Sequence, residues 1–306
     1  MKNAIQFSLL LVSLVILQSC QNSKKEDQTL AMSSGSIVEN TLSERRNLSE
    51  EFKEYWYGGT AEITSYSLSQ ERYGELREGT SVNIYVTEDF LPEVQVKANR
   101  SAPNNIPVLK LNNTKKYLTG IYPYSVMTST FSPVSEQSHA IKVSHSMQEW
   151  CGHVYMQLNN RNGYELKAHS YFEGEADQEW KVPEVWLESE LWNLIRINPE
   201  ELPTGNFDIL PSFEFARMSH KELAPTKATA SLKQDSGISS YTLTYPTHNR
   251  ELVIQFNSEF PYIIEGWKET HPNGLTTTAK KMKQIKSAYW GQNSNKYVFL
   301  RDSLGI

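Results

Sequence analysis

Cysteine is scarce in this sequence: the 306 residues include only Cys20 and Cys151. Two cysteines cannot build the framework of several disulfides that stabilises many small exported domains. If Cys20 is modified, Cys151 is left as a single thiol that is buried, paired between chains or used in chemistry. The low cysteine content therefore makes these two positions informative.

A concentration of basic residues is also missing. The chain has 30 lysines and arginines against 35 aspartates and glutamates, which gives a formal net charge of −5. A mildly acidic protein without a basic stripe is not expected to bind nucleic acid. Downstream of the N-terminal segment, no apolar run is long enough to span a membrane as a helix.

The usual signatures of catalysis are absent as well. The sequence has no glycine-rich phosphate loop, no Gly-x-Ser-x-Gly turn and no convincing order of Ser, His and Asp. Strands do not alternate with helices, which argues against a doubly wound nucleotide-binding fold. Five histidines lie in alternating or turn-like segments, where we expect no special role for them: His139, His145, His220, His248 and His271.

The N-terminus has the pattern of a bacterial lipoprotein. Lys2 precedes an apolar run over residues 5–17, which has the length of a signal-peptide core. Residues 17–20 read Leu-Gln-Ser-Cys and resemble a lipobox, in which cleavage before the cysteine exposes it for acylation. We predict that residues 1–19 are removed and that Cys20 is lipidated, which would attach the protein to a membrane through its acyl chains. The alternative is an ordinary secretory signal with an incidental cysteine.

A polar tether is expected between this anchor and the folded domain. Residues 20–46 lack hydrophobic periodicity and cannot bury enough apolar surface to offset the cost of ordering. The charged cluster at residues 24–27 fits either a surface-export signal or a solvated linker. Gln21 stands where enteric bacteria use aspartate to mark inner-membrane retention. We therefore predict a lipid-anchored protein of the outer membrane, on its periplasmic face or at the cell surface.

The rest of the chain, residues 47–306, predicts a single mainly β domain. Apolar residues alternate with polar ones, as at Val82, Ile84 and Val86, and Gly, Pro and Asn separate such runs. About a dozen strands with hairpin-length connections predict a large curved antiparallel sheet or open barrel with a few packed helices. Similar runs occur at 205–215, 226–233, 239–245 and 250–256.

Three helices are expected to interrupt the strands. The first covers residues 47–57, with Asn47 as its N-cap, and the second begins at Pro183 and ends before Pro199. The third begins at residue 276 or 277. Its lysines predict either a solvated face or docking on an anionic lipid or glycan surface; they are Lys280, Lys281, Lys283 and Lys286.

The hairpin at residues 150–172 combines a thiol with two imidazoles. Cys151, His153 and His169 share the polar face of its two strands. If the hairpin closes symmetrically, His153 faces His169, whereas a slip of two residues keeps the faces but separates the histidines. Such a group could bind a transition metal such as zinc or supply a thiolate nucleophile. The alternative is a buried cysteine with histidines at the surface.

Acidic and aromatic residues elsewhere extend these hypotheses. Glu173, Glu175 and Asp177 follow the hairpin and could supply a further ligand or base. Aromatic side chains could line a glycan or lipid pocket, although at strand spacing they are usually part of the core. The candidates are Glu265-Gly266-Trp267, Tyr122, Tyr124 and Phe131.

Four aromatic motifs are distinctive. They are Glu54-Tyr55-Trp56-Tyr57-Gly58 with Ala61-Glu62-Ile63, Gly120-Ile121-Tyr122-Pro123-Tyr124, Glu149-Trp150-Cys151-Gly152-His153-Val154-Tyr155 and Tyr171-Phe172-Glu173-Gly174-Glu175-Ala176-Asp177. Together they resemble a family of uncharacterised flavobacterial lipoproteins of the Bacteroidetes, and the resemblance covers most of the mature chain. It implies an envelope lipoprotein and no established activity.

Members of that family are sometimes labelled as septum formation inhibitor Maf. True Maf proteins resemble cytoplasmic nucleotide pyrophosphatases that carry Ala-Ser-x-Ser-Pro-Arg-Arg after their first strand. The nearest match here, at residues 43–46, lacks the strand, the proline and the second serine. The sequence therefore does not support nucleotide chemistry.

These observations favour a binding function over a catalytic one. We predict an outer-membrane lipoprotein that binds an envelope component (a lipid, a glycan or a protein partner) without catalysis and without a resident cofactor. The anchor, the tether and the missing catalytic signatures motivate this prediction. The alternative is a metal- or thiol-dependent enzyme centred on Cys151, His153 and His169, with zinc as the candidate metal.

Overall fold

The computed structural model describes residues 45–306. The predicted signal peptide, the lipidation site Cys20 and nearly all of the predicted tether lie outside the described residues. None of the helices in residues 45–306 has the length and hydrophobicity that a membrane-spanning helix requires. Arg46, which the predicted tether includes, is held on the folded body by Glu201, at an Nη2–Oε2 distance of 2.7 Å.

One open sheet of 16 strands makes up most of the described chain, which confirms the predicted mainly β class. The strand order is β10-β11-β12-β13-β14-β15-β16-β1-β2-β4-β5-β6-β7-β8-β9, and the short β3 pairs with β2. Neighbouring strands are antiparallel apart from β10 and β11, which are parallel. One half of the sheet contains β1 (Ala61–Arg72), β2 (Glu75–Leu91), β3 (Val96–Lys97), β4 (Ile106–Thr119), β5 (Tyr122–Pro133), β6 (Lys142–Glu149), β7 (Gly152–Asn160), β8 (Tyr164–Ser170) and β9 (Gln178–Val182). The other half contains β10 (Trp186–Leu187), β11 (Gly205–Leu210), β12 (Thr226–Lys233), β13 (Ile238–Tyr245), β14 (Arg250–Asn257), β15 (Ile264–Thr270) and β16 (Thr276–Ser287).

Four short α-helices accompany the sheet within residues 45–306: α1 (Glu50–Trp56), α2 (Glu188–Ile197), α3 (Phe213–Ser219) and α4 (Leu300–Leu304). Single 3-10 turns lie at Pro199–Glu201, Pro246–His248, Tyr289–Gly291 and Asn295–Tyr297. The cap of α1 is Ser49, whose Oγ accepts a hydrogen bond from the Phe52 amide at 3.1 Å. The predicted cap at Asn47 is therefore two residues early.

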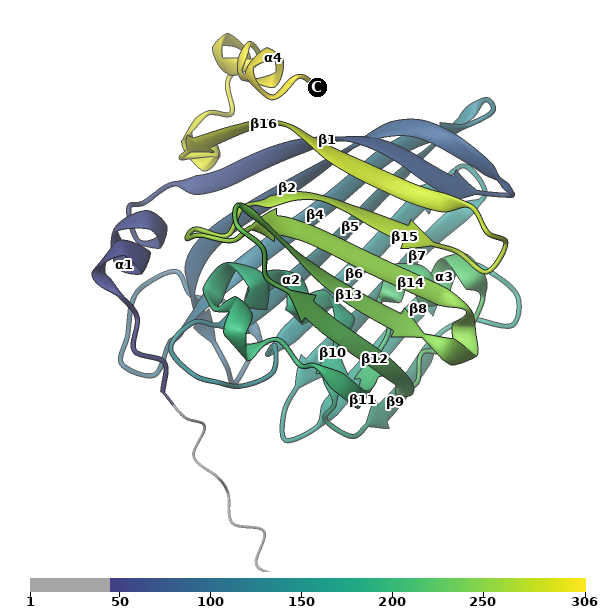
Figure 1. Ribbon diagram of the computed structural model, residues 1–306, viewed down its shortest axis with the longest axis horizontal. Coiled ribbons are helices and arrows are strands. Elements are labelled where there is room, and N and C mark those ends of the chain that lie inside the picture. Colours follow the sequence, from purple (N-terminus) through teal and green to yellow (C-terminus); the bar gives the residue numbers. More distant parts are fainter. Residues whose placement is uncertain (1–44) are drawn as a thin grey trace, which may run out of the picture. The chain divides into compact units, whose positions relative to one another are not determined.

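The two halves of the sheet face one another with α2 between them. Figure 1 shows the strands β11–β15 in front of the strands β4–β8. On one side of α2, the Asn193 amide donates to the Leu109 carbonyl of β4 at 2.9 Å. On the other side, the indole of Trp192 lies 5.2 Å from that of Trp267 on β15. Contacts with both halves make α2 the interior element of the fold.

The sequence of α2 explains its position. Leu191, Leu194 and Ile195 are buried, and they lie three and four residues apart on one helical face. The predicted start at Pro183 is wrong, because Trp186–Leu187 pairs with β11 as strand β10. The helix begins after Leu187, whose amide donates to the Glu190 carboxylate at 2.9 Å and so finds a partner at the helix start.

A buried ion pair joins α2 to β1. Both side chains of Arg196 and Glu62 are 1% exposed, and the guanidinium donates to both carboxylate oxygens at 2.6 Å. Burial alone would raise the pKa of Glu62, but the Arg196 charge outweighs it and keeps that pKa below its ordinary value. Two desolvated charges in bidentate contact therefore fix the helix against the strand.

The helix predicted after Thr276 is wrong, because residues Thr276–Ser287 form strand β16 between β15 and β1. The segment opens with three threonines, whose β-branched side chains suit a strand. Pairing on both edges also satisfies backbone groups that a helix would leave open on two neighbouring strands. Lys281 pairs with Glu265, and the Lys286 ammonium lies 3.5 Å from the ring centroid of Tyr55.

Residues 205–215, predicted as one strand-like run, divide into two elements. The strand β11 ends at Leu210, and Ser212 caps α3 by accepting a hydrogen bond from the Phe215 amide at 3.1 Å. The serine cap following Pro211 favours a helix start over a continued strand. As a result, Glu214 and Met218 lie on a helix that faces the interior cavity.

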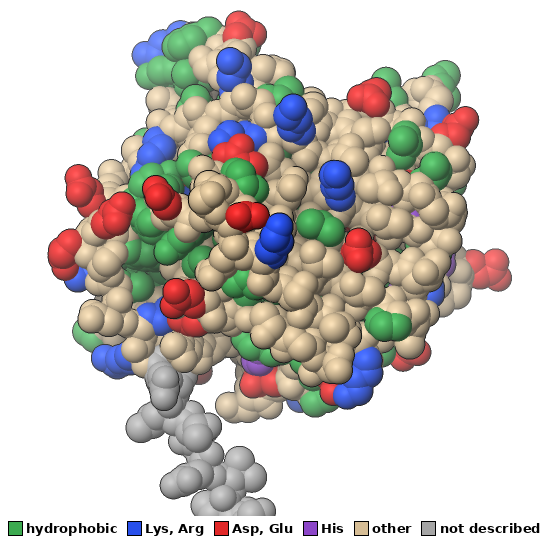
Figure 2. Space-filling view, viewed as in Figure 1, with side chains coloured by type: hydrophobic (Ala, Val, Ile, Leu, Met, Phe, Trp, Pro, Cys, Tyr) green, Lys and Arg blue, Asp and Glu red, His purple; other side chains and the backbone are tan. Residues whose placement is uncertain are grey.

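The outer face of the front strands is mixed in charge. Figure 2 shows basic and acidic side chains scattered over β12–β16, with polar and backbone atoms between them. Ion pairs such as Lys227 with Asp208, at 2.8 Å, account for part of this pattern. On the face in view, neither sign of charge forms a continuous stripe.

Candidate functional site

A cavity of about 250 Å³ lies inside the curled sheet. Its walls come from β1, β4, β5, β14 and β15, together with α2 and α3. Asn273 is an exposed residue of the turn between β15 and β16, and it lines the cavity together with the half-buried Met218. The cavity therefore reaches the surface between that turn and α3.

One part of the cavity wall is apolar and aromatic. Trp192 of α2 and Trp267 of β15 meet edge to face, with an angle of 87° between their rings. A Cβ at Gly266 would overlap the backbone carbonyl of Ala279, so glycine is required where β15 and β16 approach next to Trp267. The other apolar residues of the wall are Leu111, Phe215, Met218, Leu252 and Pro272.

The floor of the cavity contains a buried charge network around Arg250. Its guanidinium donates to the two oxygens of Glu188 at 2.5 and 2.7 Å and to Glu269 at 2.6 Å. The Tyr245 hydroxyl also donates to Glu188, at 2.6 Å. Burial would raise the pKa of Glu269, but the charge of Arg250 outweighs it and holds that pKa at about 2. The Arg250 guanidinium thus directs its hydrogen bonds to Glu188 and Glu269.

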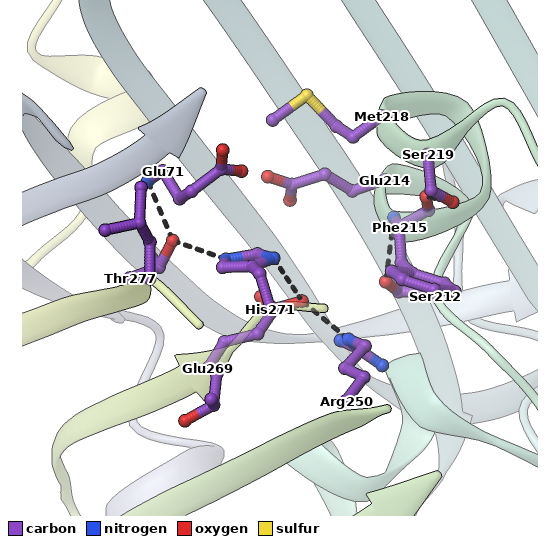
Figure 3. A network of polar contacts seen from close by, with 12 residues as sticks. Glu71, Ser212, Glu214, Phe215, Met218, Ser219, Arg250, Glu269, His271 and Thr277 are labelled. Atoms are coloured by element: carbon purple, nitrogen blue, oxygen red, sulfur yellow. Dashed lines mark hydrogen bonds and ion pairs between the residues drawn. The ribbon is translucent and has the colours of Figure 1, made fainter. Parts of the chain in front are cut away.

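The network continues to the strand edge through a histidine. His271 Nε2 lies 2.8 Å from Thr277 Oγ1, and its Nδ1 lies 3.9 Å from Glu269 Oε1. Thr277 Oγ1 in turn accepts a hydrogen bond from the Glu71 amide at 2.9 Å (Figure 3). His271 therefore links the buried carboxylate to the end of β1 beside the opening.

Helix α3 is fastened across the opposite side of the cavity. Glu214 Oε1 lies 2.8 Å from the Lys115 ammonium of β4. The Arg72 guanidinium donates to the Met218 carbonyl at 3.0 Å and to the Tyr124 hydroxyl at 3.3 Å. Figure 3 shows the carboxylates of Glu214 and Glu71 pointing toward one another across the cavity.

A neutral histidine lies behind this wall. His145 is 1% exposed, and its Nδ1 is 2.9 Å from the hydroxyl of the cavity residue Thr128. Burial, reinforced by the charges of Lys115 and Arg217, lowers the pKa of His145 to about 3. The ring is therefore uncharged at neutral pH and adds no positive charge next to Lys115.

The hairpin of β7 and β8 differs from the predicted symmetrical register. His169 pairs with Tyr155, and His153 pairs instead with Gln148 of β6. The predicted facing of His153 and His169 is therefore wrong, and the slip of two residues, which preserves both faces, is the register adopted. The apolar faces fit equally well in either register, so the sequence alone did not decide between them.

The side chains near this hairpin have other partners. His169 Nδ1 lies 3.1 Å from Asp177 Oδ1, whereas Glu175 lies 2.8 Å from His220 and 3.5 Å from Arg217 at the end of α3. Within residues 45–306, no group of three or more His, Cys, Asp or Glu side chains is arranged to hold a metal ion.

Cys151 is exposed in the turn between β6 and β7, so the alternative of a buried cysteine is wrong. Its amide donates to the Glu149 carboxylate at 2.6 Å. A hydrogen bond with Glu149 and the charge of that carboxylate raise the pKa of the Cys151 thiol above its ordinary value. Since the thiolate is the nucleophile, this environment makes Cys151 a slow one at neutral pH.

We expect Cys151 to react slowly but completely with a thiol reagent in the native protein. Peptide mass spectrometry would follow the label on this residue over time. The substitution Glu149→Gln should speed labelling at pH 7 because it removes the carboxylate that disfavours the thiolate. Glu173→Gln, in the loop between β8 and β9, is the matched control and should leave the rate unchanged. A thiol that reacts only after unfolding would contradict this expectation.

The aromatic residues predicted to line a pocket lie in different places in the structure. Trp267 lines the cavity, as the hypothesis of an aromatic pocket requires. Tyr124 instead stacks on Tyr117 at 5.0 Å, and Phe131 packs on Phe90 at 5.4 Å. His271, for which no role was expected, belongs to the cavity, and so do charged residues that sequence reasoning missed: Glu71, Lys115, Glu188, Glu214, Arg250 and Glu269.

No family model and no curated protein matches this sequence. Among solved structures, the chain is similar to a β-barrel-like protein of the domain of unknown function DUF1849 from Brucella abortus. The two share 7% sequence identity and a TM-score of 0.44, over 74% of this chain and 98% of that chain. This is a distant structural likeness.

Proposed function

We propose that the protein is a non-catalytic binding protein that takes a small component of the cell envelope into the cavity between the halves of its sheet. The observation that carries the proposal is a cavity of about 250 Å³ that combines an aromatic wall with convergent polar groups. Binding sites for small molecules usually have this combination of concave apolar surface and a few placed polar side chains. The predicted lipid anchor would hold the protein at the outer membrane.

The arrangement of charges supports binding over catalysis. Arg250 and Lys115, the cations of the wall, are each paired with carboxylates. Cations fixed in ion pairs give the cavity a polar wall and are not themselves nucleophiles. The nearly perpendicular rings of Trp192 and Trp267 form an aromatic corner, against which a ring or a short alkyl chain can pack.

The proposal is tested by filling the cavity. Ser219→Phe places a ring at a half-buried position of the cavity lining on α3, and Ser231→Phe makes the same change on the exposed face of β12. Each full-length protein would be recovered from the cell envelope and denatured, and the released small molecules would be measured by mass spectrometry. We expect a compound that is retained by the wild type and by Ser231→Phe and that falls by about tenfold in Ser219→Phe. Equal release by all three proteins, or release by none of them, would overturn the proposal.

A further inference from the structure

The cavity is lined by more acidic than basic side chains. Its lining includes four carboxylates, those of Glu71, Glu188, Glu214 and Glu269, but only two permanent cations, Lys115 and Arg250. Arg250 is divided between Glu188 and Glu269, and Lys115 is paired with Glu214. Glu71 receives only neutral donors, the Gly74 amide at 3.1 Å and the Asn273 side chain at 3.0 Å. Of the two negative charges in excess, one is shared within the Arg250 network, and the other lies on Glu71 at the end of β1, without a cation beside it.

The carboxylate of Glu71 lies opposite that of Glu214, which also has an oxygen without a hydrogen bond to the described residues. Figure 3 shows Glu71 and Glu214 turned toward one another from β1 and α3. In the hydrogen bonds made by residues 45–306, each of them uses only its Oε1 atom. One oxygen on each side of the cavity is thus left for a donor that is not part of the described protein.

A buried amide provides an independent indication of such a donor. Gln70 is 1% exposed and lines the same cavity. Its Nε2 donates to the Thr277 hydroxyl at 3.2 Å and to the Glu71 carbonyl at 3.1 Å, whereas its Oε1 has no partner among residues 45–306. A buried carbonyl without a hydrogen bond is costly, and a ligand N–H or O–H would remove that cost.

The side chains that line the cavity favour an organic cation over a metal ion as the ligand. In the described part of the chain, no group of three His, Cys, Asp or Glu side chains is arranged to hold a metal ion. An ammonium group, in contrast, donates up to three hydrogen bonds to separate acceptors. The carbon body of such a ligand would lie against Trp192, Trp267 and Met218, and aromatic faces also attract cations.

We infer that the cavity selects a small organic ammonium ion, whose charged group lies between Glu71 and Glu214 and whose body contacts the aromatic wall. This inference rests on the proposed binding function and names the chemical class of the ligand. An amino sugar and a short alkyl amine share this chemistry. Gln70 Oε1 accepts a further hydrogen bond from the same ligand.

Two pairs of probes separate charge from shape. Glucosamine is compared with glucose, and 1-aminopentane with 1-pentanol, by titration calorimetry of the full-length protein at pH 7. Within each pair the ammonium replaces a neutral hydroxyl at similar size. We expect at least one amine to bind about tenfold more tightly than its neutral partner. The pair with the larger difference distinguishes the amino sugar from the alkyl amine. Added salt should weaken the amine alone, because the attraction is electrostatic.

The variant Glu71→Gln removes the unneutralised charge with little other change, since the amide oxygen can still accept from Gly74 and Asn273. Binding of the preferred amine should fall about tenfold in this variant, while binding of its neutral partner stays the same. Glu78→Gln, on the exposed face of β2, is the matched control and should bind like the wild type. Thermal unfolding of both variants checks that the fold is retained.

The possible failures can be told apart. If the neutral probes bind as tightly as the amines, or if Glu71→Gln binds amines normally, the inferred ligand class is wrong and the proposed binding function stands. If neither amine binds, the ligand class is again wrong, and the release experiment with Ser219→Phe decides independently whether the cavity holds any ligand.

Discussion

Replacing Arg250 with methionine is expected to lower the free energy of unfolding by about 3–5 kcal/mol at neutral pH. The guanidinium is 1% exposed and is the partner of both Glu188 and Glu269. Methionine fills much of the same volume but leaves two carboxylates desolvated and without their cation. The loss therefore reflects the cost of the stranded charges more than the value of the contacts removed.

The pH dependence of this loss follows from the pKa of Glu269. In the wild type it is about 2, below its ordinary value of 4.5, so its stabilising contribution is fully present above pH 4.5 and disappears as the pH falls toward 2. Without Arg250, burial becomes the dominant effect on Glu269 and raises its pKa above the ordinary value. The variant should then gain stability as the pH falls through that raised pKa and Glu269 is protonated. The difference in stability between the two proteins should therefore begin to narrow above pH 4.5 and continue to narrow below it.

Urea unfolding from pH 7 down to pH 3 would measure both effects. Lys227→Met is the matched control, because Lys227 forms a surface ion pair with Asp208 and its side chain is 75% exposed. Such a pair contributes at most about 1 kcal/mol, so this variant should stay close to the wild type at every pH. A constant difference between Arg250→Met and the wild type across the pH range would contradict the ion-pair explanation.

Local periodicity predicts the strands of this protein well, because burial of one sheet face imposes an alternation that each segment carries by itself. It fails where pairing partners decide the structure. Residues 276–287 contain apolar positions that also fit a helix, and only β15 and β1 on either side make them a strand. Likewise, Trp186–Leu187 becomes a strand only because β11 offers a free edge.

The cavity was beyond prediction for a related reason. Its charged residues come from β1, β4, α2, α3, β14 and β15, so no short motif contains more than two of them. In the sequence, Glu188 and Glu214 look like ordinary solvent-facing carboxylates near helix starts. The hairpin with Cys151 and the histidines was conspicuous because its residues are neighbours in the sequence. Sequence reasoning therefore singled out a surface hairpin, whose residues are close along the chain. It missed the interior site, whose residues come together only when the sheet curls.

The second large effect is expected at the pair of Arg196 and Glu62. Arg196→Met or Glu62→Leu alone should lower the free energy of unfolding by about 3–5 kcal/mol, because each leaves a fully buried charge without its partner. The guanidinium also lies 5.0 Å from the ring centroid of Trp56 and 4.7 Å from that of Tyr85. An isolated Arg196 would keep these aromatic contacts, which is a reason to expect Glu62→Leu to be the milder of the two.

The double variant Arg196→Met, Glu62→Leu separates the value of the pair from the cost of breaking it. It leaves no buried charge, so we expect it to be more stable than either single variant, by about 2 kcal/mol or more. Some loss against the wild type should remain, because the Tyr55 hydroxyl and the Pro261 carbonyl lose their buried partners. Urea unfolding of the four proteins at pH 7 gives the coupling free energy directly. If the two single losses simply add, the side chains act independently and the ion pair does not join α2 to β1. A large coupling would show that the helix, and with it Trp192 and Glu188 in the cavity wall, is positioned by a charge pair outside the binding site.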